Sequence, residues 1–145
     1  MKIAIGCDHG GYALKREILR YLAQNNIAYA DCGCDGEASV DYPVYAKKVT
    51  DLICSGACER GILVCGTGIG MSIAANKCKG IRAAVCHDTF SARMTRMHND
   101  TNVLCLGGRV VGAGLALDIV ELFLHTDFLG ERHARRVQMI ADLEN

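Results

Sequence analysis

A cysteine at the start of a glycine-rich turn is the feature of this sequence best suited to chemistry. Cys65 ends the apolar run GILVC, and the residues that follow are Gly66, Thr67, Gly68, Ile69 and Gly70. Such a turn exposes several backbone N–H groups, and the helix predicted after it begins with partial positive charge, which stabilises a thiolate. Cys65 is therefore a candidate base or nucleophile, and the turn is a candidate cradle for a small anion or oxyanion.

The spacing around this turn excludes several other strand-end chemistries. A dinucleotide fingerprint needs a third glycine where Met71 stands, and a nucleotide P-loop needs a Gly-Lys pair, which the chain lacks. A cysteine phosphatase or arsenate-reductase loop needs an arginine six residues after the thiol, but that position is Met71 after Cys65 and Ala13 after Cys7. A receiver domain needs an aspartate where Cys65 stands. An anion cradle without phosphoryl transfer is the interpretation that remains.

Two arginines near the end of the sequence form a second candidate anion site. Arg132 and Arg136 are four residues apart and share one face of a predicted helix, with His133 and Arg135 nearby. They could hold a phosphate through charge-assisted hydrogen bonds. The spacing alone favours the other interpretation, a solvated helix face.

Two shorter polar segments are ambiguous when only their residue types are considered. Asp8 and His9 precede Gly10 and Gly11, a pattern compatible with either a turn or a binding site. His98 and Asn99 stand where a predicted helix ends, so they could form a C-cap or belong to a site.

The elements that must position these residues alternate between strand and helix. Short apolar runs predict strands at residues 2–7, 27–32, 61–65, 81–86 and 102–107. Helical patterns follow after Gly11 and at residues 42–56, 70–78, 89–98 and 113–125, and a last helix at 131–145 has no strand after it. Short, continuously apolar strands separated by helices are typical of a parallel sheet covered on both faces. Ligands of such sheets bind beyond the carboxyl ends of the strands, where Cys65 and Asp8 lie.

Two of the predicted helices carry more specific expectations. In the first, Leu14, Ile18 and Leu22 share an apolar face, and Lys15 is expected on the polar side. The segment 113–124 is apolar on nearly every side, which indicates burial against a second subunit.

The composition favours a single globular domain over residues 1–145. Any anion-binding site must be local, because the chain as a whole is neutral. The formal net charge is zero, so nothing favours nucleic acid or an anionic membrane as partner. No leader pattern and no membrane-span pattern are present, and nine cysteines without a Cys-x-x-Cys pair fit a reducing cytoplasm and no metal site. We interpret Cys7, Cys32 and Cys86 as small residues packed beneath turns.

Taken together, the motifs resemble a known family along nearly the whole chain. GCDHGG, DYP, CGTGIGMSIAANK, GIRAAVC, HNDTNVL, GGRVVG and ERHARRV occur in the same order as in the ribose-5-phosphate isomerase B family, which includes galactose-6-phosphate and allose-6-phosphate isomerases. The resemblance implies an α/β, Rossmann-like fold with an extra C-terminal helix. It also implies a homodimer or dimer of dimers that builds each site from two subunits and uses no metal or other cofactor.

The same resemblance assigns roles to residues. Cys65 would move a proton between C2 and C1, and His98 would assist opening of the furanose ring. The residues matching the sugar-phosphate-binding positions are Asp8, His9, Gly66, Thr67, Gly68, Ile69, Gly70, Asn99, Arg109, Arg132 and Arg136, and Asp41 and Tyr42 match a segment near the sugar. Another branch of the family uses a glutamate where this chain has Met71, which cannot accept a proton. No role follows for His87.

Aldose–ketose exchange needs a base, donors for the developing oxyanion and a handle on the nonreacting end. Cys65 could be the base, Thr67 and the amides of the turn could meet the oxyanion, and the arginines with His9 could hold the phosphate. The expected reaction is interconversion of ribose 5-phosphate and ribulose 5-phosphate through an enediolate, with an inactive monomer. Alternatives are a six-carbon sugar phosphate, a noncatalytic sugar-phosphate-binding module and a phosphocysteine carrier of the sugar-transport type.

Overall fold

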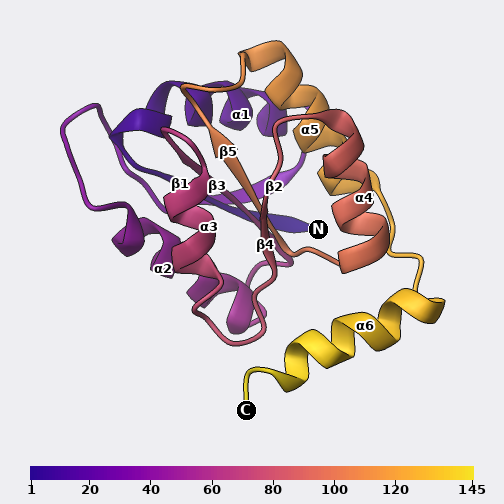
Figure 1. Ribbon diagram of the computed structural model, residues 1–145. Helices are drawn as coiled ribbons and strands as arrows, with labels where there is room; N and C mark the ends of the chain where they lie inside the picture. Colours follow the sequence, from indigo (N-terminus) through magenta and orange to yellow (C-terminus); the bar gives the residue numbers. More distant parts are fainter.

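Five parallel strands form the centre of the computed structural model, which describes residues 1–145 (Figure 1). The strands are β1 (Lys2–Cys7), β2 (Ala28–Asp31), β3 (Arg60–Cys65), β4 (Ala83–Val85) and β5 (Val103–Gly107). Their order across the sheet is β2-β1-β3-β5-β4. The chain therefore leaves β1 toward one edge and continues from β3 toward the other, which makes the junction of β1 and β3 the switch point where such folds bind ligands.

Helices cover both faces of this sheet, as the sequence predicts. They are the short 3₁₀ turn η1 (His9–Gly11), α1 (Tyr12–Gln24), α2 (Tyr42–Cys54), α3 (Ile69–Ala75), α4 (Thr89–Asn99), α5 (Ala113–His125) and α6 (Glu131–Asp142). Figure 1 shows α1 and α5 on one side of the sheet, α2 and α3 on the other, and α6 beyond the end of α4. The predicted α/β fold is confirmed, although α3 is shorter than the predicted helix at residues 70–78.

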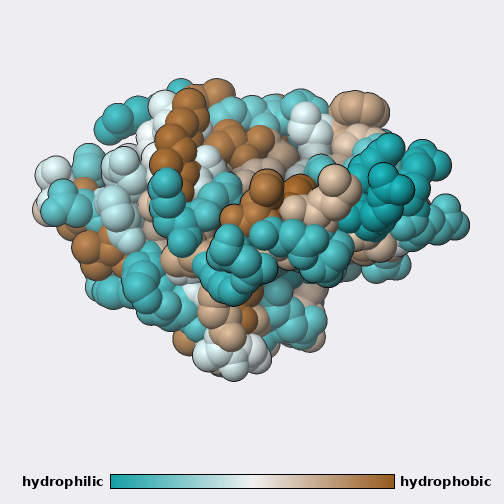
Figure 2. All heavy atoms as spheres, turned by 60° about the horizontal axis from the view of Figure 1, so that its bottom comes forward, coloured by the Kyte–Doolittle hydropathy of each residue, from teal (hydrophilic) through white to brown (hydrophobic).

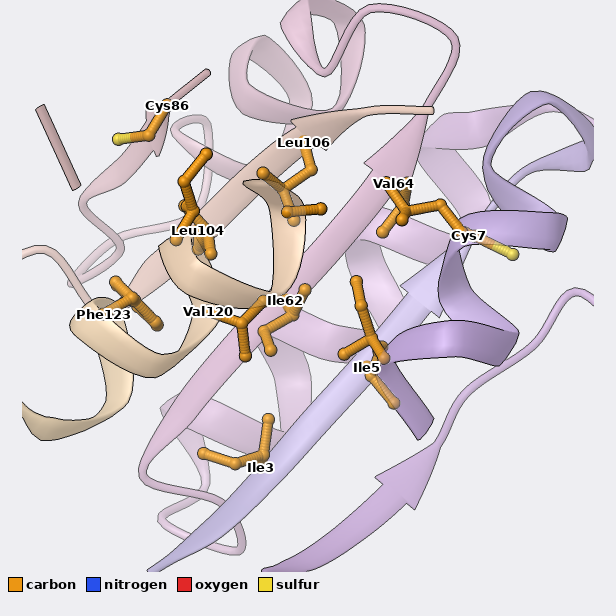
Figure 3. Packing of buried hydrophobic residues seen from close by; sticks show 14 of the residues in the cluster. Ile3, Ile5, Cys7, Ile62, Val64, Cys86, Leu104, Leu106, Val120 and Phe123 are labelled. Carbon is orange, nitrogen blue, oxygen red and sulfur yellow. The ribbon is translucent and has the colours of Figure 1, made fainter. Parts of the chain in front are cut away.

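The alternation of side chains along the strands divides the core into two layers. Ile62 and Val64 of β3 face the layer below α1 and α5, whereas Leu63 and Cys65 face the layer below α2 and α3. Figure 3 shows side chains of β1, β3 and β5 meeting Val120 and Phe123 of α5. Cys65 therefore reaches the carboxyl edge from the α2 and α3 side.

Helix α5 packs most of its apolar residues into the core of its own chain. This corrects the expectation that its apolar character indicates burial against a second subunit. Ala116, Ile119, Val120, Phe123 and Leu124 are all buried in the core. Of its large apolar side chains, Leu115 alone is substantially exposed, at 42%. The apolar character of this helix is therefore explained by its own sheet and is no argument for a second subunit.

Lys15 is buried instead of lying on the polar side of its helix. The residue is 1% exposed, and Nζ donates to Asp31 Oδ1 at 2.7 Å and to the Cys34 carbonyl oxygen at 2.8 Å. A buried ammonium group needs such partners because removal from water is costly. The pair joins α1 to the end of β2, a role that helical periodicity could not predict.

The predicted packing of the strand-end cysteines is confirmed for two of the three. Cys7 and Cys86 are buried, and burial raises the pKa of Cys7 to about 12 and that of Cys86 to about 11, so both remain thiols. Cys32 is only partly buried, and burial also raises its pKa. All nine cysteines are free.

Candidate active site

Three loops meet at the carboxyl ends of β1, β3 and β5, and glycines allow their close approach. A side-chain carbon on Gly10 would lie 3.1 Å from the Gly66 nitrogen, and one on Gly108 would lie 2.7 Å from the Gly10 carbonyl oxygen. A side chain on Gly107 would lie 2.8 Å from the carbonyl carbon of Thr67. The backbones therefore form one packed edge that brings Asp8, His9, the turn at residues 66–70 and Arg109 together.

The sulfur of Cys65 lies beneath the glycine turn. The residue is only 5% exposed in the single chain, and its Sγ accepts a hydrogen bond from the Gly68 N–H at 3.1 Å. Gly68 has φ +78°, a left-handed conformation that turns its amide back toward the sulfur and that glycine adopts without strain. This amide is placed to support negative charge on the sulfur, so the predicted turn contact is present.

Two further amides of the turn are available to a ligand. The backbone N–H groups of Gly66 and Thr67 donate no hydrogen bond within the chain. The Thr67 hydroxyl oxygen accepts from the Ile69 N–H at 3.3 Å, which leaves its own O–H free to donate outward. The turn thus offers several donors to an oxygen that gains negative charge.

Asp8 and His9 are held in defined orientations beside this turn. Asp8 is 6% exposed and caps η1 by accepting from the Gly11 N–H at 3.2 Å. His9 Nδ1 accepts from the Val40 N–H at 3.2 Å. A neutral His9 ring therefore carries its proton on Nε2, where it can be donated to a substrate oxygen.

Arg109 and Tyr42 lie against the two ends of the glycine turn. A side-chain carbon on Gly66 would be 3.2 Å from Nη1 of Arg109, and one on Gly70 would be 2.7 Å from Cζ of Tyr42. Both contacts exist because the turn residue has no side chain. Tyr42 is therefore adjacent to the turn, as expected from its motif. Asp41 directly precedes Tyr42 and is the N-cap residue of α2.

His87 also lies at this edge, directly after β4, and makes a contact that the sequence did not predict. Its Nε2 accepts from the Gly107 N–H at 3.0 Å and so connects the end of β4 with the end of β5. The only signal in the sequence is a histidine directly after a predicted strand. Its contact with β5 depends on β5 lying beside β4, which is a tertiary feature.

The other predicted site residues lie at the opposite end of the sheet. Helix α4 ends at Asn99, just before β5 begins at Val103, whereas Cys65 is paired with Gly107 at the far end of β5. Five strand residues at about 3.3 Å each span about 16 Å. Within one chain, His98 and Asn99 are therefore separated from Cys65 by the length of the sheet.

Arg132 and Arg136 accompany His98 and Asn99 at that end. Both arginines are exposed on α6, and neither forms an ion pair with a carboxylate of the chain. Figure 2 shows a dense hydrophilic cluster at the right edge, where Figure 1 places the beginning of α6. The guanidinium groups are thus free to bind an external anion.

His98, which lies on α4, stacks on a histidine of α6. The ring centroids of His98 and His133 are 4.3 Å apart, and the ring planes differ by 10°. Burial lowers the pKa of His133, and the positive charge of His98, Arg132 and Arg136 lowers it further. Both causes favour the neutral form of His133.

Four hollows of the single chain lie away from the cysteine. Asn99, Arg82 and Ile140 line a groove of about 510 Å³ beside β4, and three other cavities have volumes between about 270 and 580 Å³. Cys65 lines none of these four.

No group of His, Cys, Asp and Glu side chains is arranged to hold a metal ion. No helix is long and apolar enough to cross a bilayer.

Comparison with known proteins gives a consistent result over the whole chain. The family described as Ribose/Galactose Isomerase matches residues 3–140. The chain belongs to this family. Ribose-5-phosphate isomerase B of Escherichia coli is 48% identical over 143 residues, covering 99% of this chain and 96% of the relative.

Two further similar proteins agree. The structure of ribose-5-phosphate isomerase B from Clostridium thermocellum matches with a TM-score of 0.98 and 56% identity, covering 99% of this chain and 97% of that one. D-erythrulose-4-phosphate isomerase of Pectobacterium atrosepticum is 44% identical over 147 residues, covering 100% of this chain and 96% of the relative. The protein is thus a sugar-phosphate isomerase enzyme, and the resemblance inferred from its motifs is confirmed.

Proposed function

We propose that this protein interconverts ribose 5-phosphate and ribulose 5-phosphate, with Cys65 moving a proton between C2 and C1. The observation that carries the proposal is the Cys65 sulfur under the glycine turn, in contact with the Gly68 N–H at 3.1 Å. The names of the relatives from E. coli and C. thermocellum support the pentose substrate.

In the proton-transfer step, the Cys65 thiolate removes the hydrogen from C2 of the open-chain aldose. The electrons of the broken C–H bond form the enediolate, and the former carbonyl oxygen becomes an oxyanion. The free amides of Gly66 and Thr67, with the Thr67 hydroxyl, supply donors to that oxyanion. A proton passes from the C2 hydroxyl to the C1 oxygen, and the protonated sulfur returns its hydrogen to C1, which leaves the carbonyl at C2 and completes the ketose.

A complete site requires a second copy of the chain. His98, Arg132 and Arg136 lie at the opposite end of the sheet from Cys65, so one copy cannot present all of them to a five-carbon sugar. We assign the proton-transfer residues, with Asp8, His9 and Arg109, to one copy. The ring-opening His98, Asn99 and the arginines of α6 come from the other.

The phosphate serves as the handle for this reaction. His9 Nε2 and Arg109 can donate to it from one copy, and Arg132 and Arg136 can donate from the other. Binding energy from this remote group orients C1 and C2 at the sulfur, which a sugar without phosphate would not allow.

One relative favours a second candidate substrate. The Pectobacterium relative is named as an isomerase of D-erythrulose 4-phosphate, a four-carbon ketose phosphate. The proton transfer is the same for four, five or six carbons, so only the space around the chain distinguishes them. Rates with ribose 5-phosphate, allose 6-phosphate, galactose 6-phosphate and D-erythrulose 4-phosphate should be compared directly, and we expect the highest kcat/KM with ribose 5-phosphate.

Substitution of the proposed base tests the mechanism. Cys65→Ser should reduce exchange of the C1 hydrogen of ribulose 5-phosphate with D₂O by at least about 10²-fold, because a serine hydroxyl is a poor base at neutral pH. Binding of the sugar phosphate should persist. The exposed Cys54→Ser variant is the matched control and should exchange at the wild-type rate. Near wild-type exchange in Cys65→Ser would exclude the cysteine as base.

A further inference from the structure

We propose that His133 is a positioning residue for ring opening, whose imidazole holds the ring of His98 in the plane needed to reach the substrate. This inference rests on the proposed function, because it assigns His133 a part in the step given to His98. The carrying observation is the nearly parallel stack of the two rings at 4.3 Å.

The stack is anchored by the backbone on both sides. The Leu129 N–H donates to the Met97 carbonyl oxygen at 3.1 Å, which fixes the start of α6 against the end of α4. Gly130 adopts φ +68°, and its carbonyl oxygen accepts from the His133 N–H at 2.9 Å, which closes the first turn of α6. The two rings are therefore brought together by rigid elements and not by a mobile loop.

The surroundings of His133 fit a role in orienting the ring of His98. It is 7% exposed, and its buried Nε2 has no hydrogen-bond partner. A buried ring nitrogen without a partner is unfavourable, and an apolar side chain would pack there without that cost. The His98 ring likewise makes no hydrogen bond within the chain, so the stacked face is the contact that sets its plane, and both of its nitrogens remain free for the substrate.

The charges around the pair disfavour a proton on His133. Helix α6 brings Arg132 and Arg136 close to His133, with Glu131 as a weaker opposing charge, and α4 brings His98. Two imidazolium rings at this separation would repel each other. His133 therefore adds no positive charge beside His98, and both ring nitrogens of His98 stay available to the substrate.

The experiment separates ring opening from proton transfer. Ribose 5-phosphate enters as a furanose and must be opened. Ribulose 5-phosphate cannot form a furanose because its O5 carries the phosphate, so exchange of its C1 hydrogen with D₂O needs no ring opening. His133→Ala should lower kcat for ribose 5-phosphate by about 10-fold or more, within the range of acid–base contributions, and leave exchange within about twofold.

A conservative variant and a control sharpen the test. His133→Phe keeps a flat ring for stacking and should retain ribose 5-phosphate turnover within about threefold, which a need for the imidazole itself would not allow. The exposed His125→Ala on α5 should behave as wild type in both reactions. Melting temperatures of all variants verify folding.

The possible failures are distinguishable. Equal losses of turnover and exchange in His133→Ala, or unchanged ribose 5-phosphate turnover, would overturn the positioning role while leaving the proposed function intact. Wild-type protein inactive on ribose 5-phosphate would overturn the proposed function and this inference with it.

Discussion

At the scale of single residues, three heteroatoms of the candidate site are oriented by backbone N–H groups. Val40 donates to His9 Nδ1, Gly68 donates to Cys65 Sγ, and Gly107 donates to His87 Nε2. A backbone donor keeps its proton at all working pH values. The orientation of these side chains is therefore independent of the protonation of neighbouring groups, which suits a site that transfers protons.

Arg136 provides the residue-scale prediction. Arg136→Ala should raise KM for ribose 5-phosphate by about 10–100-fold, the equivalent of losing one charge-assisted hydrogen bond, with little change in kcat. Steady-state kinetics measures both parameters. Arg135→Ala removes the neighbouring exposed guanidinium and is the control. If KM rises equally in both variants, the effect is general loss of positive charge and Arg136 does not hold the phosphate.

At the scale of elements, the fold connects distant ends of secondary structure through side chains that cap them. Arg60 at the start of β3 donates from Nη1 to the carbonyl oxygens of Phe123 and Leu124, both at 2.7 Å. These carbonyls belong to the last turn of α5, where the helix leaves oxygens without an internal partner. The contact fixes α5 on the sheet beside the strand that carries Cys65.

Removal of this cap should destabilise the fold. Arg60→Met keeps much of the aliphatic stem and should lower the free energy of unfolding by about 1.5–3 kcal/mol, because hydrogen bonds from a charged donor are lost. Urea denaturation measures the change. Arg20→Met removes an exposed arginine that pairs only with Glu17 and should change it by less than about 1 kcal/mol. Equal stability of the two variants would show that Arg60 does not secure α5.

At the scale of the whole molecule, the two groups of site residues lie on opposite ends of one sheet. Exposed apolar side chains such as Ile69, Ile73, Phe90 and Val110 leave surface that a second copy could cover. In a two-fold pair, each copy would present its Cys65 edge to the His98 end of its partner, so both sites would be equivalent.

Mixed assemblies test this arrangement. Cys65→Ser and His98→Asn should each be inactive on ribose 5-phosphate. Chains of both kinds expressed together should form hybrids with one intact site and regain about a quarter of wild-type activity, since half the pairs are hybrids with half their sites intact. Isomerase assays on the unfractionated mixture of pairs measure the recovery. Absence of recovery in verified hybrids would place both residues in a site within one copy.

Sequence patterns alone predicted the type and order of the elements, the family and the residues at the ends of β1 and β3. Periodicity and glycine turns are local properties, so they predict where strands and helices lie and which residues follow each strand. Four features arise from tertiary packing and could not be predicted from sequence patterns. They are the insertion of β5 between β3 and β4, the burial of Lys15, the contact of His87 with Gly107 and the stack of His98 on His133. Each depends on which distant segments pack together, and that is settled by the burial of apolar surface over the whole chain, not by the spacing of neighbouring residues.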